Sequence, residues 1–184
     1  MQFRRATAQD IAALSQLVNR AYRPAPEHAG WTHENGLVSG ERINHAQLAS
    51  LLTQPNGQVL LGCHGQQIVA CVHIENAGNY GYVGMLAVDP TCQTGGLGKA
   101  MLAHAEQQLQ AQYNVGRSRM TVLTSRPELR AFYLRRGYTP TGERLPFPLE
   151  AGVGELLRAD LELEVLEKQL GQIEQFTTPE KQAE

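Results

Sequence analysis

A short glycine-rich loop is the part of the sequence best suited to hold an anion. This segment, called the glycine loop below, reads Gln93, Thr94, Gly95, Gly96, Leu97, Gly98 and Lys99. It lies between a strand-like and a helix-like run, and the first turn of a helix leaves backbone N–H groups unpaired and carries about half a positive charge. Glycine lets a phosphate group approach those N–H groups closely. The spacing therefore predicts an anion site at a strand-to-helix junction.

Two common nucleotide-binding motifs do not fit this loop. A Walker loop needs Gly five residues before the Gly-Lys pair and Ser or Thr after it, whereas this chain has Gln93 and Ala100 at those positions. A dinucleotide fingerprint needs a third glycine where Met101 stands. The antiparallel strands expected before the loop also argue against a dinucleotide-binding fold. The sequence therefore supports neither nucleotide-binding fold.

The glycine loop resembles the acetyl-CoA loop of the GNAT superfamily of N-acetyltransferases, whose motif is Gln/Arg-x-x-Gly-x-Gly/Ala. Gln93, Gly96 and Gly98 match that motif. The same family has a tyrosine-bearing helix downstream, and residues 131–138, Ala-Phe-Tyr-Leu-Arg-Arg-Gly-Tyr, resemble it. The resemblance covers about residues 2–168. It implies an acyltransferase that uses acetyl-CoA as co-substrate and no metal.

The resemblance also implies roles for residues at the CoA site. Backbone N–H groups from Gln93 through Lys99 would hold the CoA pyrophosphate. The strand end before the loop, Leu86, Ala87 and Val88, would pair its main chain with the pantetheine arm. The family often has Asn seven residues before its tyrosine, where this chain has Arg126. That departure puts this one contact in doubt, although Arg126 could approach a phosphate.

Tyr133 stands at the family's general-acid position. A tyrosine of pKa about 10 is protonated at neutral pH, so Tyr133 could donate a proton to the CoA sulfur as thiolate develops. The alternative is a core aromatic residue, because Leu129, Phe132 and Tyr133 form an apolar helical stripe. We expect Tyr133 to be the general acid and Phe132 to belong to the core.

The amine acceptor also has to lose a proton, because an alkylammonium group near pKa 10 is mostly charged at pH 7. Glu75 is our first candidate for the proton acceptor. His73, two residues earlier on the same strand face, and Tyr82 on the next strand are the others. Each also fits a structural role: a solvated hairpin residue, a paired histidine of the sheet and a packing aromatic.

Residues 21–43 are rich in Pro, Gly and His and form a long irregular connection. In the resembling family this region lines the acceptor side, so Tyr22 and Trp31, together with Tyr82, are candidate substrate-binding residues. The bulky region around Trp31 favours a covered pocket and hence a primary amine of a small metabolite. A protein or peptide amine and a non-catalytic acyl-CoA-binding module are alternatives. Acceptor identity and the use of longer acyl-CoA donors stay open.

Composition limits the remaining classes. The 184-residue chain has 16 Lys+Arg and 18 Asp+Glu and a net charge of −2, so it lacks the basic field that favours nucleic-acid or anionic-membrane binding. Its three cysteines contain no Cys-x-x-Cys pair, and no segment looks like a signal peptide or membrane span. We expect a cytoplasmic protein, a monomer or homodimer, without nucleic-acid, membrane or metal partners.

The elements that would position these residues follow from hydrophobic periodicity. Helix-like runs follow Thr7, Asn44, Gly96 and Ser125. Strand-like runs cover residues 3–6, 58–63, 67–74, 80–88, 120–124, 138–143 and 161–166. The predicted order is βααβββαβαββ, a mixed α/β (α+β) fold with a mostly antiparallel central sheet flanked by helices, which is also the order of the GNAT family. The crossover through the third helix predicts one parallel strand pair.

Three details complete the prediction. Ser125-x-x-Glu128 is typical of a capping box at a helix start. The alternation of apolar and acidic residues from Leu161 to Leu166 predicts a strand with one exposed face, which as an edge strand could pair in a dimer. The polar composition near the end predicts one acetyltransferase domain, residues 1–170, followed by a polar tail, residues 171–184.

Overall fold

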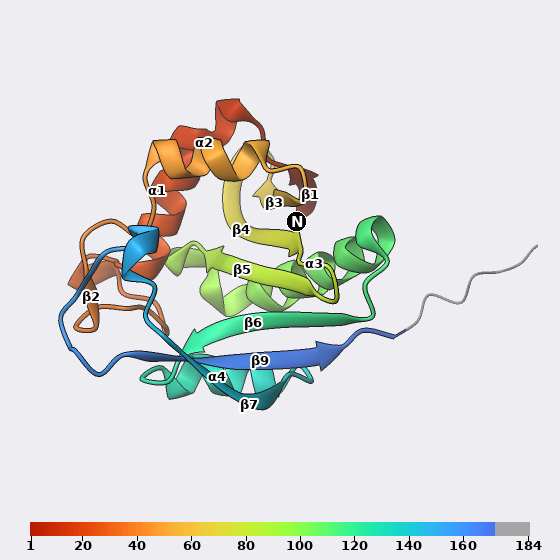
Figure 1. The fold of residues 1–184 in the computed structure, drawn as a ribbon. Coiled ribbons are helices and arrows are strands. Elements are labelled where there is room, and N and C mark those ends of the chain that lie inside the picture. The colour runs from red at the N-terminus through yellow and green to blue at the C-terminus, as the bar shows by residue number, and fades with distance from the viewer. Residues whose placement is uncertain (172–184) are drawn as a thin grey trace, which may run out of the picture.

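One seven-stranded sheet organises residues 1–171, the part of the chain that the computed structural model describes (Figure 1). The strands are β1 (Gln2–Arg5), β2 (Val38–Ser39), β3 (Gly57–His64), β4 (Gln67–Asn76), β5 (Gly81–Val88), β6 (Arg117–Leu123), β7 (Thr139–Pro146), β8 (Glu155–Leu156) and β9 (Glu162–Gln169). The helices are α1 (Ile11–Tyr22), α2 (His45–Thr53), α3 (Leu97–Tyr113) and α4 (Pro127–Leu134), with 3-10 helices η1 (Ala8–Asp10), η2 (Pro26–His28), η3 (Pro90–Gly95) and η4 (Leu149–Ala151). Apart from β2 and β8 the order is βααβββαβαββ, so the predicted mixed, mostly antiparallel fold is confirmed.

The central strands of the sheet are buried on both faces. Its strand order is β1-β3-β4-β5-β6-β9-β7. Successive side chains of a strand point to opposite faces, and in β3 Val59 and Leu61 join the core beneath α1 and α2, whereas Leu60 joins the core beneath α3 and α4. Figure 1 shows α1 and α2 grouped on one side of the sheet, with α3 running along the other. Burial on both faces explains why β3 and β4 are nearly continuous apolar runs.

The strands β5 and β6 diverge soon after they begin. They form the one parallel pair of the sheet within residues 1–171, as the α3 crossover predicts, but only Gly81 and Tyr82 of β5 are paired with β6. Beyond Tyr82, β5 continues to Val88 with β4 as its partner. A register shift in this pairing accompanies a left-handed backbone at Met85, whose φ is 50°. The divergence leaves one backbone edge of β5 open next to the glycine loop.

The start of α4 differs from the prediction. The capping box at Ser125 and Glu128 is wrong, because the helix begins at Pro127 with Arg126 at its N-cap and with no side-chain cap. Proline fits the first helical position, where no N–H partner is needed. The Arg126 side chain turns inward to a buried carboxylate, Glu34, and therefore stands close to the interior rather than at a solvated helix end.

The strand β9 is not an edge strand, and the predicted dimer contact along it is wrong. It lies between β6 and β7 and pairs with both. Two of its acidic side chains are therefore held by arginines of the fold, Glu164 by Arg130 at 2.7 Å and Glu167 by Arg119 at 2.6 Å. The exposed strand at this edge of the sheet is β7.

The short strands β2 and β8 were not predicted. Each has two residues, Val38–Ser39 and Glu155–Leu156, which is too short for an alternating pattern. They pair antiparallel and bring the segment after α1 against the segment after β7. All of the predicted polar tail except residue 171 lies outside the described residues. Within residues 1–171, no helix has the length and apolar character required to cross a bilayer.

Candidate active site

Three adjoining cavities follow the divergence of β5 and β6. The first, called the loop cavity, has a volume of about 310 Å³ and is bordered by the glycine loop, β5 and α4. The second, the central cavity, has about 140 Å³ and shares Tyr22, Leu86 and Tyr133 with the first. The third, the outer cavity, has about 330 Å³ and shares Arg42 and Tyr82 with the second. Because neighbouring cavities share lining residues, the three lie in a row that starts at the glycine loop, and this row is called the passage below.

The glycine loop has the geometry of an anion cradle. Asp89 accepts a hydrogen bond from the Thr91 N–H at 3.0 Å and so starts η3, and Gly96 then starts α3 with a left-handed φ of 73°. The N–H groups of the first turn of α3 have no partner within the helix. A Cβ at Gly98 would lie 3.4 Å from the Phe132 ring, so the small residue allows α3 to approach α4 closely. The loop cavity opens at this helix end.

Most of the predicted CoA-binding residues border the loop cavity. They are Leu86, Ala87, Val88, Gln93, Gly96, Gly98, Lys99 and Arg126. Gly95 and Leu97 belong to the same loop but do not border the cavity, and the predicted contact of Thr94 lies outside what the structure describes. The individual contacts with CoA stay predictions. Arg126 also borders the central cavity, which no glycine-loop residue does, so its guanidinium belongs to the side of the passage away from the loop.

Two cationic residues of the loop cavity were missed by the sequence reasoning. Arg135 and Arg136 at the end of α4 both border it. The Arg136 guanidinium lies 3.3 Å from the centre of the Phe132 ring and donates to the Phe132 carbonyl at 2.5 Å. Burial, followed by repulsion from Arg135, lowers the pKa of Arg136. The paired arginines next to the tyrosine motif were the available signal, and they add positive charge where the glycine loop is expected to bind an anion.

Gln93 braces the glycine loop against the segment that carries Trp31. Its Oε1 accepts from the Trp31 N–H at 3.0 Å, and its Nε2 donates to the Val88 carbonyl at 3.4 Å. The Gln93 amide fills the place where a Cβ at Gly30 would stand, so a larger residue there would displace this flexible side-chain end. Trp31 borders the loop cavity and remains 47% exposed, with its ring centre 5.7 Å from that of Phe132. Trp31 therefore covers part of the loop cavity.

Tyr133 stands where the loop and central cavities meet. Its side chain is buried, with its residue 7% exposed, and it packs edge-on against Phe132 and Tyr138. Burial, and then the nearby Tyr22, raise the pKa of its hydroxyl well above the ordinary value, so the phenol stays neutral. The hydroxyl makes no hydrogen bond to any other residue in 1–171. Tyr133 therefore presents an uncommitted proton donor at the junction.

The structure does not bring Glu75 to the passage. It borders none of the three cavities, and its Oε1 accepts from Asn56 Nδ2 at 2.9 Å. His73, which is two residues earlier on the same strand, borders the outer cavity, whereas Glu75 does not. Tyr82 borders both the central and outer cavities, with its hydroxyl 3.3 Å from Thr121 Oγ1.

His73 combines burial with an unused ring nitrogen. Its Nε2 is inaccessible to solvent and makes no hydrogen bond within the described part of the chain. Burial lowers the pKa of the imidazole, against the opposing effect of Glu75. The ring is therefore neutral at pH 7. Arg42 and Tyr82 are the other ionisable groups that border the same cavity.

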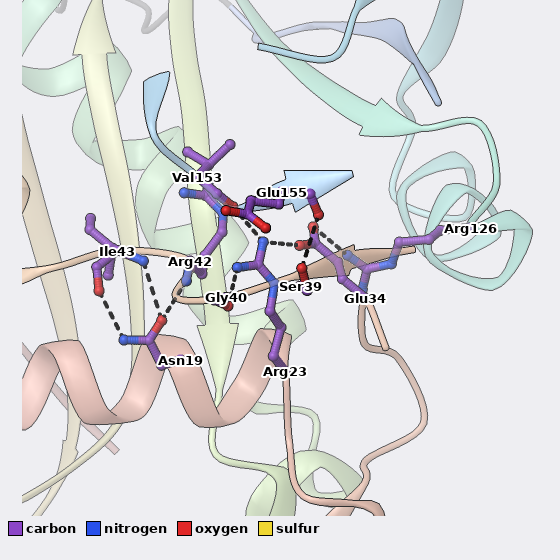
Figure 2. Close-up of polar contacts among 10 residues, drawn as sticks. All are labelled: Asn19, Arg23, Glu34, Ser39, Gly40, Arg42, Ile43, Arg126, Val153 and Glu155. Carbon is purple, nitrogen blue, oxygen red and sulfur yellow. Dashed lines mark hydrogen bonds and ion pairs between the residues drawn. The ribbon is translucent and has the colours of Figure 1, made fainter. Parts of the chain in front are cut away.

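A buried ion network closes the central cavity on one side (Figure 2). Glu34 Oε2 lies 3.1 Å from Arg23 Nη2, and Glu34 Oε1 lies 3.5 Å from Arg126 Nη1. Arg126 also donates to Thr32 Oγ1 at 2.5 Å, and Arg23 donates to the Val153 carbonyl. All three ionic side chains are at most 9% exposed. Figure 2 shows the two guanidinium groups reaching Glu34 from opposite sides.

Tyr22 connects this network to the passage. It borders the loop and central cavities, and the Arg42 and Arg126 guanidinium groups lie 5.1 Å and 6.0 Å from the centre of its ring. Within residues 1–171, no group of three or more His, Cys, Asp or Glu side chains has the arrangement of a metal site. The predicted substrate-side residues Tyr22, Trp31 and Tyr82 thus all border the passage, whereas the network around Glu34 had no local sequence signal.

Comparisons with known proteins agree with this geometry. The family model of the acetyltransferase (GNAT) domain matches residues 32–147. Among solved structures, smu.2055 from Streptococcus mutans UA159 is similar, with 17% identity, coverage of 93% of this chain and 100% of that chain, and a TM-score of 0.71. No curated protein matches the chain by sequence.

Two other similar structures are those of N-acetyltransferases. The ribosomal-protein-S18-alanine N-acetyltransferase from Escherichia coli has 15% identity, coverage of 99% of this chain and 98% of that chain, and a TM-score of 0.65. The PaiA N-acetyltransferase from Thermoplasma acidophilum, solved in complex with coenzyme A, has 14% identity, coverage of 92% and 98%, and a TM-score of 0.68. At these identities the likeness concerns the fold.

Proposed function

The chain belongs to the GNAT acetyltransferase family and is an acyltransferase, and we propose that it transfers the acetyl group of acetyl-CoA to a primary amine of a small metabolite. The observation that carries this proposal is the adjacency of two cavities, one at the glycine loop and one beyond it, with Tyr133 bordering both. A phosphate-bearing donor can enter from the loop side while an amine enters from the other side.

The residues present fit coenzyme A. The open edge of β5 after Tyr82 offers unpaired backbone groups to an amide-bearing arm. The first turn of α3 offers N–H groups to a pyrophosphate, and Lys99, Arg135 and Arg136 border the same cavity with positive charge. Bound acetyl-CoA would supply an activated thioester. The chain's part is to hold that donor and the amine in one passage, which supplies much of the rate of a bimolecular transfer.

Tyr133 is the proposed general acid. Its neutral hydroxyl holds a proton at the junction of the two cavities and donates it to the departing thiolate sulfur. The size of the central cavity, about 140 Å³, favours a slender group such as an aminoalkyl chain beyond this hydroxyl. Phe147, Pro148 and Val153 cover that cavity from the segment after β7, which supports a small acceptor.

A protein amine is the second candidate acceptor. The E. coli enzyme whose fold is similar over nearly all of both chains acts on a ribosomal-protein alanine. The experiment that tests both candidates incubates the protein with acetyl-CoA and a panel of small amines and peptides and measures free thiol. Thiol release above slow hydrolysis, with the small amines preferred, supports the proposal. CoA binding without transfer to any amine would indicate a non-catalytic binding module.

The glycine loop gives a prediction about CoA affinity. Because Gly96 has a φ of 73°, a branched residue there is strained by about 1–2 kcal/mol, and its side chain also adds bulk beside the proposed pyrophosphate site. We expect Gly96→Val to weaken CoA binding about tenfold or more by calorimetry. The matched control is Gly95→Ala, since Gly95 does not border the cavity and a Cβ there meets its nearest atom at 4.0 Å. Equal affinities of the two variants would contradict the proposed CoA site.

His73 replaces Glu75 as our proposed proton acceptor from the amine. Because burial lowers the pKa of His73 below its ordinary value of 6.5, the ring is neutral and competent above that pH and is lost as a base when the pH falls. We expect kcat of the wild type at saturating amine to have an acidic limb with a midpoint below pH 6.5, and His73→Gln to remove this limb. The matched control is Glu75→Gln, which we expect to retain it. Retention of the limb in His73→Gln would exclude the histidine.

A further inference from the structure

Three arginine side chains from separate segments meet around the central cavity. Arg42 and Arg126 border it directly. Arg23 donates to the carbonyl of Val153, which also borders it. Buried guanidinium groups need a counter-charge, and this applies to Arg23 and Arg126, whereas Arg42 is only partly buried.

Two of the three arginines have carboxylate partners. Glu34 Oε2 pairs with Arg23 and Glu34 Oε1 with Arg126, at 3.1 and 3.5 Å. Glu128, whose side chain is 38% exposed, also lies 3.6 Å from Arg126 Nε. The one buried carboxylate of this region is therefore shared by Arg23 and Arg126, and Arg42 is not among its partners.

Arg42 is the third guanidinium, and no carboxylate lies within 4.0 Å of it in residues 1–171. Its backbone is fixed, because its N–H donates to Asn19 Oδ1 at 2.6 Å (Figure 2). Its guanidinium lies over the Tyr22 ring at 5.1 Å. Burial raises the pKa of Tyr22 to about 12, so the tyrosine is neutral and does not balance the charge.

The position of Arg42 suits contact with an acceptor. It borders both the central and the outer cavity, on the acceptor side of Tyr133 in the proposed passage. His73, the other basic group of the outer cavity, is neutral at pH 7 and adds no positive charge. An anionic group that reached this position would find a positioned guanidinium, and Arg binds carboxylate and phosphate through two parallel N–H bonds.

We propose that Arg42 binds an anionic group of the acceptor, a carboxylate or a phosphate, so that the acceptor class is amino acids or aminoalkyl phosphates rather than simple alkyl amines. This inference rests on the proposed acetyl transfer and names its substrate class. It also predicts discrimination against a polypeptide N-terminus, in which the carboxylate next to the amine is replaced by a neutral peptide bond.

The test compares matched pairs of acceptors that differ in one charge. One arm pairs free L-amino acids with their carboxamides, and the other pairs aminoethyl phosphate with ethanolamine. Thiol release from acetyl-CoA gives KM for each. We expect the wild type to have a KM at least tenfold lower for the anionic member of one pair, and that pair identifies the anion. In Arg42→Met the preference should fall to within about threefold, while Arg42→Lys retains part of it.

The controls separate this inference from the proposed function. Arg158→Met removes an exposed arginine that borders none of the cavities and should retain the full preference. Because the readout is a ratio within each variant, a loss of folded protein does not imitate the effect. Transfer to neutral and anionic members with equal KM, or a preference that survives Arg42→Met, overturns the role of Arg42 alone. CoA binding without transfer to any amine overturns the proposed function and this inference with it.

Discussion

Replacing Tyr133 with Phe should lower kcat by about 10²-fold or more, because proton donation by a positioned side chain contributes roughly that much. The hydroxyl is the only atom removed, and it makes no hydrogen bond to another residue in 1–171. Burial and stability should therefore change little. The measurement is single-turnover thiol release from acetyl-CoA with a saturating amine, alongside calorimetry of CoA binding, which should remain within about threefold of the wild type.

The pH dependence of the wild-type enzyme provides a second check. Because burial raises the pKa of Tyr133, the wild type should keep its proton donor well above pH 10 and show no loss from its ionisation up to that pH. The matched control is Tyr138→Phe, whose hydroxyl is bonded to Ser118 at 2.9 Å in the core and borders none of the cavities. It should lower stability more than turnover per folded molecule. Unchanged turnover in Tyr133→Phe would remove the general-acid role.

The glycine loop and Tyr133 could be predicted because their signals are local. Helical and strand periodicities are set by neighbours in the chain, and both motifs lie within runs of fewer than ten residues at element boundaries. The same periodicity gave the order of the eleven main elements. It did not give the order of strands in the sheet, which depends on long-range pairing. The alternation in β9 therefore predicts an edge strand, although β9 pairs with β7 on its outer side.

The acceptor side could not be predicted in the same way. Arg42 and Val153 are separated by more than 100 residues and meet at one cavity, and neither segment has a periodic pattern. For Glu75 the alternation of the strand predicted the same face as for His73, but the extent of the cavity along that face depends on α2 and on the segment around Val153. An isolated Glu34 in an irregular segment is normally exposed. Its burial becomes favourable only through two distant arginines.

Glu34→Gln should be the most destabilising of the substitutions considered, by about 3–5 kcal/mol, because removing one partner of a buried ionic network leaves uncompensated charge. Gln has nearly the same size and shape as Glu, so the loss of unfolding free energy would come from the removed charge rather than from altered packing. For a domain of this length the expected decrease in Tm is about 10 °C. Urea unfolding at pH 7 measures the free energy, and an exposed ion pair supplies the control: Glu162→Gln, facing Arg144 at 2.8 Å, should cost less than about 1 kcal/mol.

A double-mutant cycle with Arg126→Met identifies the source of that loss. If the cost of Glu34→Gln comes from the guanidinium groups it leaves unpaired, it should be smaller by at least about 1 kcal/mol when Arg126 is already replaced, since only Arg23 then remains without its carboxylate. Purely additive losses would contradict a shared charge network. Equal effects of Glu34→Gln and Glu162→Gln would show that Glu34 is not needed to hold the arginines at the wall of the central cavity. The pairing of Arg23 and Arg126 with Glu34 would then no longer support the proposed role of Arg42.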